Sequence, residues 1–300
     1  MLIRRLGGAL TVAATLLGGA CNRGAADPAG AARVVSVSKQ INELLYAIGA
    51  QDVLVARDLT SIYPPAIQRL PSVGYHRALS ADGIISMKPT LFLTDGNLGP
   101  DAVLQQLRTV GIPILELRAG SAPDSAEALL VRLGREFHRE RAADSVLAEW
   151  RRGMKEVLRD SARLAAIRSP RPRVLVMHFG QLNNSYLAVG RGSPAAQMIA
   201  WAGGVNAIDS VGRMTRLTPE LIAKAAPDVI IATDVGFDRV GSVANFAQLP
   251  GVGLTPAAKA GRIHRIDESE IMYFGPRTPA AARRIASWLH PAGSATAAAP

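Results

Sequence analysis

The sequence predicts an α/β fold of two Rossmann-like lobes joined by one long α-helix. Short runs rich in valine and isoleucine alternate with segments of helical periodicity in two parts of the chain, 33–120 and 170–290. Between them lies an amphipathic stretch, 121–169, which we expect to form the linking helix. This order of elements predicts two sheets covered by helices, with binding loops at the ends of the strands.

The N-terminal lobe is predicted from the rhythm of strands and helices over 33–120. A β-branched run begins at Arg33, the helical pattern that follows stops at Gly49, and a second apolar run begins at Val53. After a loop rich in glycine and proline, Ser80 can cap a further helix. We expect strands at 33–38, 53–56, 90–94 and 113–117, and helices at 40–48, 80–87 and 101–110.

The linking segment reads as a single helix from 124 to 167. It contains no proline, and only Gly134 and Gly153 interrupt it. Its acidic and basic residues are nearly balanced and spaced for pairing between neighbouring turns, which indicates a solvated face. Its apolar residues recur at helical spacing; among them are Leu129, Leu130, Leu133, Phe137, Val146, Leu147 and Trp150.

The C-terminal lobe begins after the break at Pro170–Pro172. Thr218, Pro219 and Glu220 supply a cap, a first-turn proline and an early acid in the order typical of a helix start. The last residues, 291–300, are small and featureless, and we expect a disordered tail. We expect strands at 173–179, 186–189, 228–232 and 262–266, and helices at 194–201, 218–226 and 278–289.

The N-terminus has the pattern of an export signal. Two arginines precede the apolar run 6–17, which is too short to cross a bilayer, and small residues then lead to Cys21. We therefore expect a signal peptide over 1–21 and a tether over 22–32. Cys21 is the only cysteine, and its position predicts lipid attachment, although a lipobox usually carries leucine where Gly18 stands. A periplasmic protein and a cell-envelope lipoprotein both remain open.

Composition excludes one class of partner. The formal net charge is +10, but basic residues are scattered singly among acidic ones and aromatic residues make up only 5% of the chain. This pattern lacks the basic stripe of a nucleic-acid-binding surface. The excess of arginine instead suits anionic ligands, including carboxylates, which the guanidinium fork binds well.

The loop between Tyr63 and Arg77 has the chemistry of a metal ligand. A phenol binds hard ferric iron once it is deprotonated, and a neighbouring cation favours the phenolate, so the run Gly74, Tyr75, His76, Arg77 suits an iron porphyrin. We expect an extended loop that places Tyr75 and Arg77 on one side and turns His76 away. Imidazole also binds haem iron, so the chemistry alone leaves Tyr75 and His76 as alternative ligands.

Several segments together carry a family resemblance over 33–290. They include YPP at 63–65, GYHRALSADGI at 74–84, KPTLFL at 88–93, PDVII at 227–231 and FGPRTP at 274–279. In their order and spacing, the chain resembles the helix-linked (class III) periplasmic substrate-binding proteins of ABC importers. The GYHRALSADGI segment is similar to that of the hemin-binding proteins of this class.

The resemblance implies a set of site residues. Tyr75 would ligate ferric haem iron, and Arg77 would hydrogen-bond its phenolate. On the second lobe, His178 would be either a second axial ligand or a histidine whose ring is hydrogen-bonded by the backbone at the end of its strand. By the same resemblance, the FGPR segment would shape a turn near the cleft. Other candidates for contacts to the ring or its propionates, each with a structural role as the alternative, are Tyr186, Arg191 and Tyr273.

Importer docking is implied for one carboxylate on each lobe. Asp82 stands where the class usually has glutamate, and Glu220 is the matching position on the second lobe. Both carboxylates would pair with permease arginines, and both would also be favourable as acids in the first turn of a helix.

We therefore predict a binding protein and not an enzyme. It would capture ferric haem, with haem b as the transported ligand, in a cleft between the lobes, and deliver it to an ABC permease with its ATPase in the inner membrane. We expect a monomer with no affinity for nucleic acid. The alternatives are a cobalamin or ferric-siderophore binding protein of the same class, or a two-lobed cleft enzyme such as a glycosyltransferase. The enzyme is disfavoured because no phosphate-cradling loop or nucleophile–base pair is visible.

Overall fold

The computed structural model describes residues 32–291 except 119, 168–169, 182–183, 209–211 and 213. The predicted signal peptide with Cys21, and nearly all of the predicted tether and tail, lie outside these residues. Among the helices of the described residues, none combines the length and the apolar character needed to cross a bilayer.

The N-terminal lobe is built on a parallel four-stranded sheet in the order β2-β1-β3-β4. Its central strand is completely buried because valine fills both faces, as the β-branched run predicted. The strands are β1 (Val34–Ser36), β2 (Leu54–Arg57), β3 (Leu91–Thr94) and β4 (Ile114–Glu116). The helices are α1 (Lys39–Ala47), η1 (Gln51–Val53), η2 (Pro65–Arg69), α2 (Ala81–Ile85) and α3 (Ala102–Thr109).

The C-terminal lobe contains a mixed six-stranded sheet in the order β10-β9-β5-β6-β8, with β7 also paired to β5. β10, β9, β5 and β7 pair with one another in parallel, whereas β6 is antiparallel to β5 and β8. The strands are β5 (Arg173–Gly180), β6 (Ser185–Val189), β7 (Val205–Asn206), β8 (Met214–Arg216), β9 (Val229–Thr233) and β10 (Ile263–Ile266). The helices are α6 (Pro194–Trp201), α7 (Pro219–Ala225), α8 (Asp234–Asp238), α9 (Val243–Ala247), η3 (Val252–Leu254), α10 (Pro256–Lys259), α11 (Glu268–Met272) and α12 (Thr278–Leu289).

The linking segment consists of two helices, α4 (Pro123–Glu136) and α5 (Glu140–Ile167), so the single helix expected over 124–167 is wrong. His138 adopts a left-handed conformation with φ of 52°, and the Arg139 N–H donates to the Gly134 carbonyl at 2.7 Å. This is the hydrogen bond of a Schellman helix end, in which glycine usually holds the left-handed position. The break escaped prediction because a histidine stands there.

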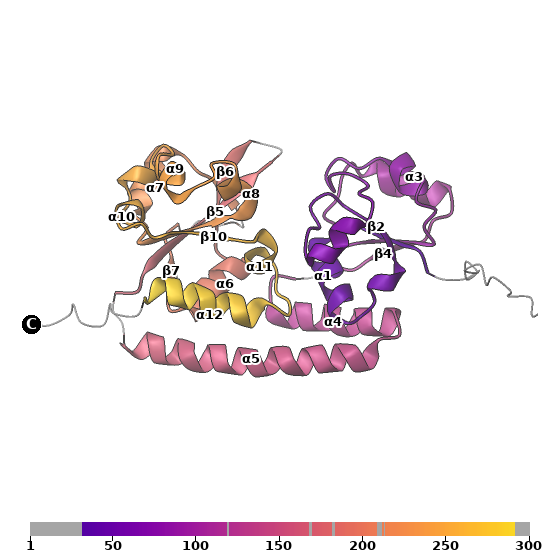
Figure 1. Cartoon of the computed structure of the whole chain (residues 1–300), viewed down its shortest axis with the longest axis horizontal. Helices are drawn as coiled ribbons and strands as arrows, with labels where there is room; N and C mark the ends of the chain where they lie inside the picture. Colours follow the sequence, from indigo (N-terminus) through magenta and orange to yellow (C-terminus); the bar gives the residue numbers. More distant parts are fainter. Residues whose placement is uncertain are drawn as a thin grey trace, which may run out of the picture. The chain divides into compact units, whose positions relative to one another are not determined.

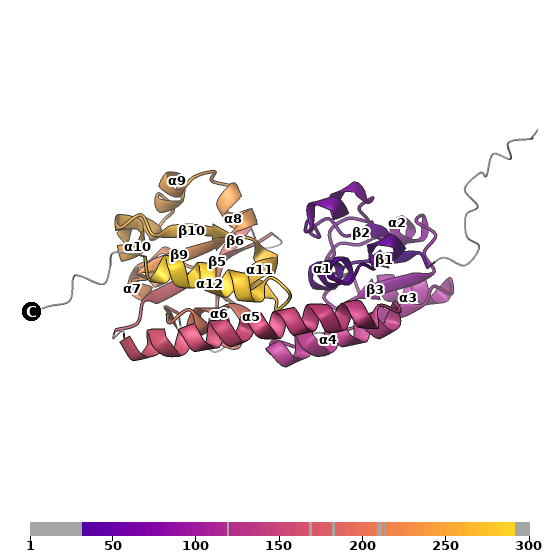
Figure 2. The ribbon, with the colours of Figure 1, turned by 60° about the horizontal axis from the view of Figure 1, so that its bottom comes forward.

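The long helix α5 nevertheless joins the lobes, as the predicted fold class requires. It packs against α1 and α4 on one side of the molecule and against α6 and α12 on the other, and it runs along both lobes in Figures 1 and 2. Its buried residues Leu147 and Trp150 belong to one hydrophobic core that also includes Ile41 of α1 and Ile285 of α12. Because this core continues from lobe to lobe, α5 is a structural spine and not a flexible linker.

Candidate functional site

The carboxyl ends of the strands in both sheets carry polar residues, and they meet at a cleft between the lobes. On the N-terminal lobe, Lys39, Asp58 and Asp95 follow β1, β2 and β3. On the C-terminal lobe, His178 lies near the end of β5, and Asp234 and Glu268 follow β9 and β10. Cavities lined from both lobes occupy this position, where parallel sheets usually place their ligands.

The segment that carries Tyr75 is a tight turn. The Ala78 N–H donates to the Tyr75 carbonyl at 2.8 Å, and Gly74 before it has φ of +99°, which favours glycine. The expected extended loop is therefore wrong, and so is the expectation that His76 points away. Because the chain turns here, Tyr75, His76 and Arg77 all line the same cavity.

His76 is held by a buried carboxylate. Its Nδ1 lies 3.7 Å from Asp58 Oδ2 and 3.3 Å from the Thr60 hydroxyl, and its ring contacts Tyr75 edge-on with 4.7 Å between centroids. Burial opposes the charge of Asp58, but hydrogen bonds with His76, Ser61 and Thr60 outweigh it and lower the pKa of this carboxyl. With Nδ1 engaged by Asp58, Nε2 is the nitrogen of His76 that is available to the cavity.

The cavity that receives these side chains has a volume of about 310 Å³ and is lined from both lobes. It brings together most of the predicted site: Tyr75, His76 and Arg77 from the N-terminal lobe, and His178 and Tyr273 from the C-terminal lobe. Arg191 does not line it, but lies exposed in the turn before α6. Tyr186 has a structural place, because its hydroxyl donates to the Gly236 carbonyl at 2.6 Å.

His178 presents a neutral imidazole to this cavity. Burial lowers its pKa below the usual 6.5, and Lys39 adds to the lowering, while Glu268 and Asp234 partly oppose it. Its Nδ1 lies 3.4 Å from the Thr233 hydroxyl and 4.0 Å from Glu268 Oε2. A neutral imidazole fixed on its Nδ1 side suits a metal ligand that binds through Nε2.

The lowered pKa of His178 makes stability depend on pH. Below pH 6.5 the unfolded chain takes up a proton at residue 178 that the folded chain does not, so the free energy of unfolding falls as pH drops from 6.5 to the folded pKa. His178→Gln removes this contribution. Urea unfolding of ligand-free protein between pH 7.5 and 5.5 should show a smaller pH dependence in the variant; equal slopes would contradict the assignment.

Tyr273 lies in a buried setting close to several acids. Burial, together with the charges of Glu268, Asp95 and Asp58, raises the pKa of Tyr273 far above the usual 10. Its hydroxyl therefore stays protonated and can donate a hydrogen bond to a ligand, but it is a poor source of a phenolate.

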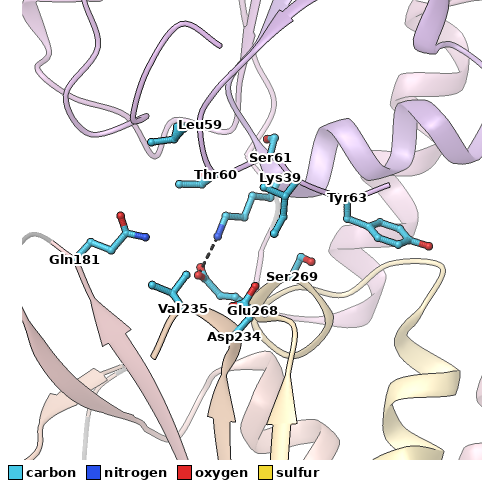
Figure 3. Close-up of a pocket in the computed structure, with 11 residues that line it drawn as sticks. Lys39, Leu59, Thr60, Ser61, Tyr63, Gln181, Asp234, Val235, Glu268 and Ser269 are labelled. Carbon is cyan, nitrogen blue, oxygen red and sulfur yellow. Dashed lines mark hydrogen bonds and ion pairs between the residues drawn. The ribbon is translucent and has the colours of Figure 1, made fainter. Parts of the chain in front are cut away.

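A buried ion pair crosses the cleft at its base. Lys39 Nζ lies 2.9 Å from Glu268 Oε2, and both side chains are 14% exposed (Figure 3). Burial opposes the charge of Glu268, but the charge and the hydrogen bond of Lys39 outweigh it and lower the pKa of this carboxyl. Both residues line the 310 Å³ cavity and a smaller one of about 130 Å³, so the pair lies where the two cavities adjoin.

A second ion pair also joins α1 to the C-terminal lobe, here to Arg277 at the start of α12. Arg277 Nε and Nη2 donate to the two carboxylate oxygens of Glu43 at 2.9 and 2.6 Å, and the guanidinium lies 3.6 Å from the ring centroid of Tyr63. We call these two pairs, Lys39–Glu268 and Glu43–Arg277, the interlobe latch. The latch was missed because FGPR was expected only to shape a turn, and nothing local in the sequence pairs residue 277 with residue 43.

Comparison with known proteins places the chain in a family. The model of the periplasmic binding protein family matches residues 34–270. The chain belongs to the periplasmic binding protein family. This agrees with its two lobes, its spine helix and its interlobe cleft.

Solved structures of such binding proteins match most of the chain. The apo form of the periplasmic heme-binding protein RhuT from Roseiflexus sp. RS-1 is 30% identical, with a TM-score of 0.76, over 87% of this chain and 98% of that one. The periplasmic heme-binding protein BhuT in complex with two hemes is 31% identical, with a TM-score of 0.76, over 87% of this chain and 100% of that one. The class III fold predicted from sequence is therefore confirmed.

Curated relatives of this binding protein are named for a different ligand, vitamin B12 or cobalamin. The vitamin B12-binding protein of Pectobacterium atrosepticum is 24% identical over 258 residues, which are 86% of this chain and 88% of the relative. The cobalamin-binding protein of Halobacterium salinarum is 26% identical over 86% of this chain and 69% of the relative. These comparisons agree on a binding protein and differ on the tetrapyrrole.

The two predicted docking acids lie on the surface of this binding protein, one on each lobe. Asp82 is exposed in the first turn of α2, and Glu220 is exposed in the first turn of α7. Hydrogen bonds from its own backbone N–H and from Thr218 lower the pKa of Glu220. Both carboxylates are therefore accessible to a partner, and both also stand at helix N-termini, where negative charge is favourable.

Proposed function

We propose that this binding protein captures ferric haem in the interlobe cleft and delivers it to an ABC importer. The observation that carries this proposal is one cavity lined by a phenol, a guanidinium and two imidazoles: Tyr75, Arg77, His76 and His178. Anionic oxygen and imidazole are both established haem-iron ligands. The heme-binding names of the 30–31% identical solved structures point to the same ligand.

Tyr75 is the proposed iron ligand. Ferric iron favours the deprotonated phenol, and Arg77, which lines the cavity two residues later, favours the negative charge that develops on this oxygen. Asp58 fixes His76, whose ring supports Tyr75 from the side.

The C-terminal lobe offers the other side of the ring. His178 is proposed as a second axial ligand through Nε2, and Tyr273 as a hydrogen-bond donor to the ligand. Arg191 is exposed at the entrance to α6, and we propose only a peripheral contact for it.

Delivery is proposed to use the two exposed acids. Asp82 and Glu220 would pair with arginines of the permease, one on each lobe. The expected site of action is the periplasm, with Cys21 as the proposed point of lipid attachment after signal removal.

Cobalamin is the second candidate ligand, because the curated relatives are named for it. The two ligands differ in the source of the axial metal ligand: haem takes it from a protein side chain, whereas cobalamin already carries its own lower ligand. Titration of the purified protein with hemin, with cyanocobalamin as competitor, should give a haem complex that excess cyanocobalamin does not displace. Displacement at equal concentrations would favour cobalamin.

A further inference from the structure

A second cavity opens from the site toward the outer end of the N-terminal sheet. It has a volume of about 500 Å³, and it shares Arg77, Asn97, Met214, Met272 and Tyr273 with the cavity of Tyr75. The two cavities therefore adjoin, with these side chains between them. We call the larger one the side cavity; the axial ligands proposed above do not line it.

Among the described residues, Arg77 and Arg118 bring their guanidinium groups to the side cavity. Arg77 belongs to the turn of Tyr75, and Arg118 follows the outer strand β4. Within the part of the chain that the structure describes, the guanidinium of Arg77 has no hydrogen bond or ion pair. Arg118 uses Nε to donate to Glu116, which leaves both terminal nitrogens for a ligand.

Arg118 is an exposed side chain, 77% accessible, that pairs with Glu116 above Gly96. Gly96 has φ of +84°, and a Cβ on it would lie 3.1 Å from Arg118 Nε and 2.8 Å from Glu116 Oε1. The ion pair of Arg118 with Glu116 thus lies directly over the backbone of Gly96. A side chain at position 96 would push the ends of these two side chains aside, and the positive φ favours glycine there.

Among the residues that the structure describes, Asp95 is the acid that lines the side cavity, and both of its carboxylate oxygens accept hydrogen bonds. Asp95 Oδ2 accepts from the Ser38 hydroxyl at 2.8 Å, and its Oδ1 accepts from the Asn97 N–H at 2.9 Å. Asp95 therefore shapes its own loop and does not pair with either arginine. Arg77 and the terminal nitrogens of Arg118 therefore offer unused donors to an anionic group, although the carboxylates of Asp95 and Glu116 lie close by.

We propose that Arg118 binds a carboxylate of the ligand in the side cavity and so selects tetrapyrroles that carry free carboxylates on one edge. This rests on the proposed function, because the ring must lie in the adjoining cavity for its edge to reach Arg118. Haem carries two propionates on one edge, whereas the side chains of the corrin ring end in neutral amides. The arginine thus separates the two ligand classes by charge.

The test uses a pair of probes that differ only in the carboxylates: hemin and its dimethyl ester, titrated in the same mild detergent. Wild-type protein should bind hemin at least about tenfold more tightly than the ester. Arg118→Gln should weaken hemin binding about tenfold, leave ester binding unchanged and keep the absorption spectrum of the complex. Arg108→Gln, at an exposed arginine of α3 that lines none of these cavities, should change neither affinity.

The outcomes separate the two levels of the proposal. If wild type binds hemin and ester equally well, or if Arg118→Gln weakens both to the same extent, carboxylate selection by Arg118 is wrong while haem binding stands. If wild type binds neither probe, the proposed function fails and the selection by Arg118 fails with it. Hemin binding by wild type should also weaken with added salt, whereas ester binding should not.

Discussion

Tyr75→Phe is expected to weaken hemin binding at least about 100-fold, which corresponds to about 3 kcal/mol or more. The substitution removes only the phenolic oxygen and keeps the ring that packs edge-on against His76. The loss therefore reports the iron–oxygen bond and not a disturbed turn. Titration of the variant by absorbance, beside wild type, measures it.

Tyr273→Phe is the matched control for this variant. Tyr273 lines the same cavity, but burial keeps its hydroxyl protonated, so its removal costs at most one hydrogen bond to the ligand. We expect a loss of about tenfold or less, with an unchanged spectrum. If Tyr273→Phe abolished the spectrum while Tyr75→Phe kept it, the iron ligand would be on the other lobe.

Arg277→Met is expected to lower the free energy of unfolding by about 3–5 kcal/mol, because it leaves the carboxylate of Glu43 buried without its partner. The two side chains are only 16% and 10% exposed. Burial opposes the charge of Arg277. The hydrogen bonds to Glu43 and the negative charge of Glu43 outweigh burial and raise the pKa of Arg277 above its usual value. Urea unfolding at pH 7 measures the change.

An exposed pair provides the comparison. Arg283 Nη1 lies 3.3 Å from Glu156 Oε2 between α12 and α5, with side chains 47% and 58% exposed, so Arg283→Met should cost less than about 1 kcal/mol. The double variant Glu43→Gln with Arg277→Met should recover part of the loss, since residue 43 then carries no charge, while Glu270 and Asp267, the other acids beside Arg277, keep their pairs with Arg284 and Arg265. Equal effects of Arg277→Met and Arg283→Met would mean that the interlobe latch does not stabilise the fold.

The periodicity of apolar residues, together with the capping residues, glycines and prolines that bound helices and strands, predicted most of the regular structure. The α12 helix occupies 278–289 as expected, and β5 extends the expected strand by one residue, because buried runs and capped amphipathic segments leave strong local signals. The short elements β7, β8 and α8–α11 were not predicted, since two to five residues are too few to show a period.

The site was predictable where chemistry is concentrated in one segment, and not where it is assembled from distant ones. Tyr75, His76 and Arg77 are consecutive, so their joint role could be proposed before the fold was known. The interlobe latch joins α1 to α11 and to the start of α12. Arg118 reaches the side cavity because β4 lies at the sheet edge. Such contacts depend on tertiary structure, which no local pattern encodes.

The account depends on a bond between the Tyr75 oxygen and ferric iron. Resonance Raman spectroscopy of the wild-type protein loaded with hemin tests it most directly, because an iron-bound phenolate adds ring vibrations of its own to the haem spectrum. We predict a ferric complex that shows these phenolate bands, and their loss in Tyr75→Phe. A complex without phenolate bands, ligated by histidine alone, would contradict the account.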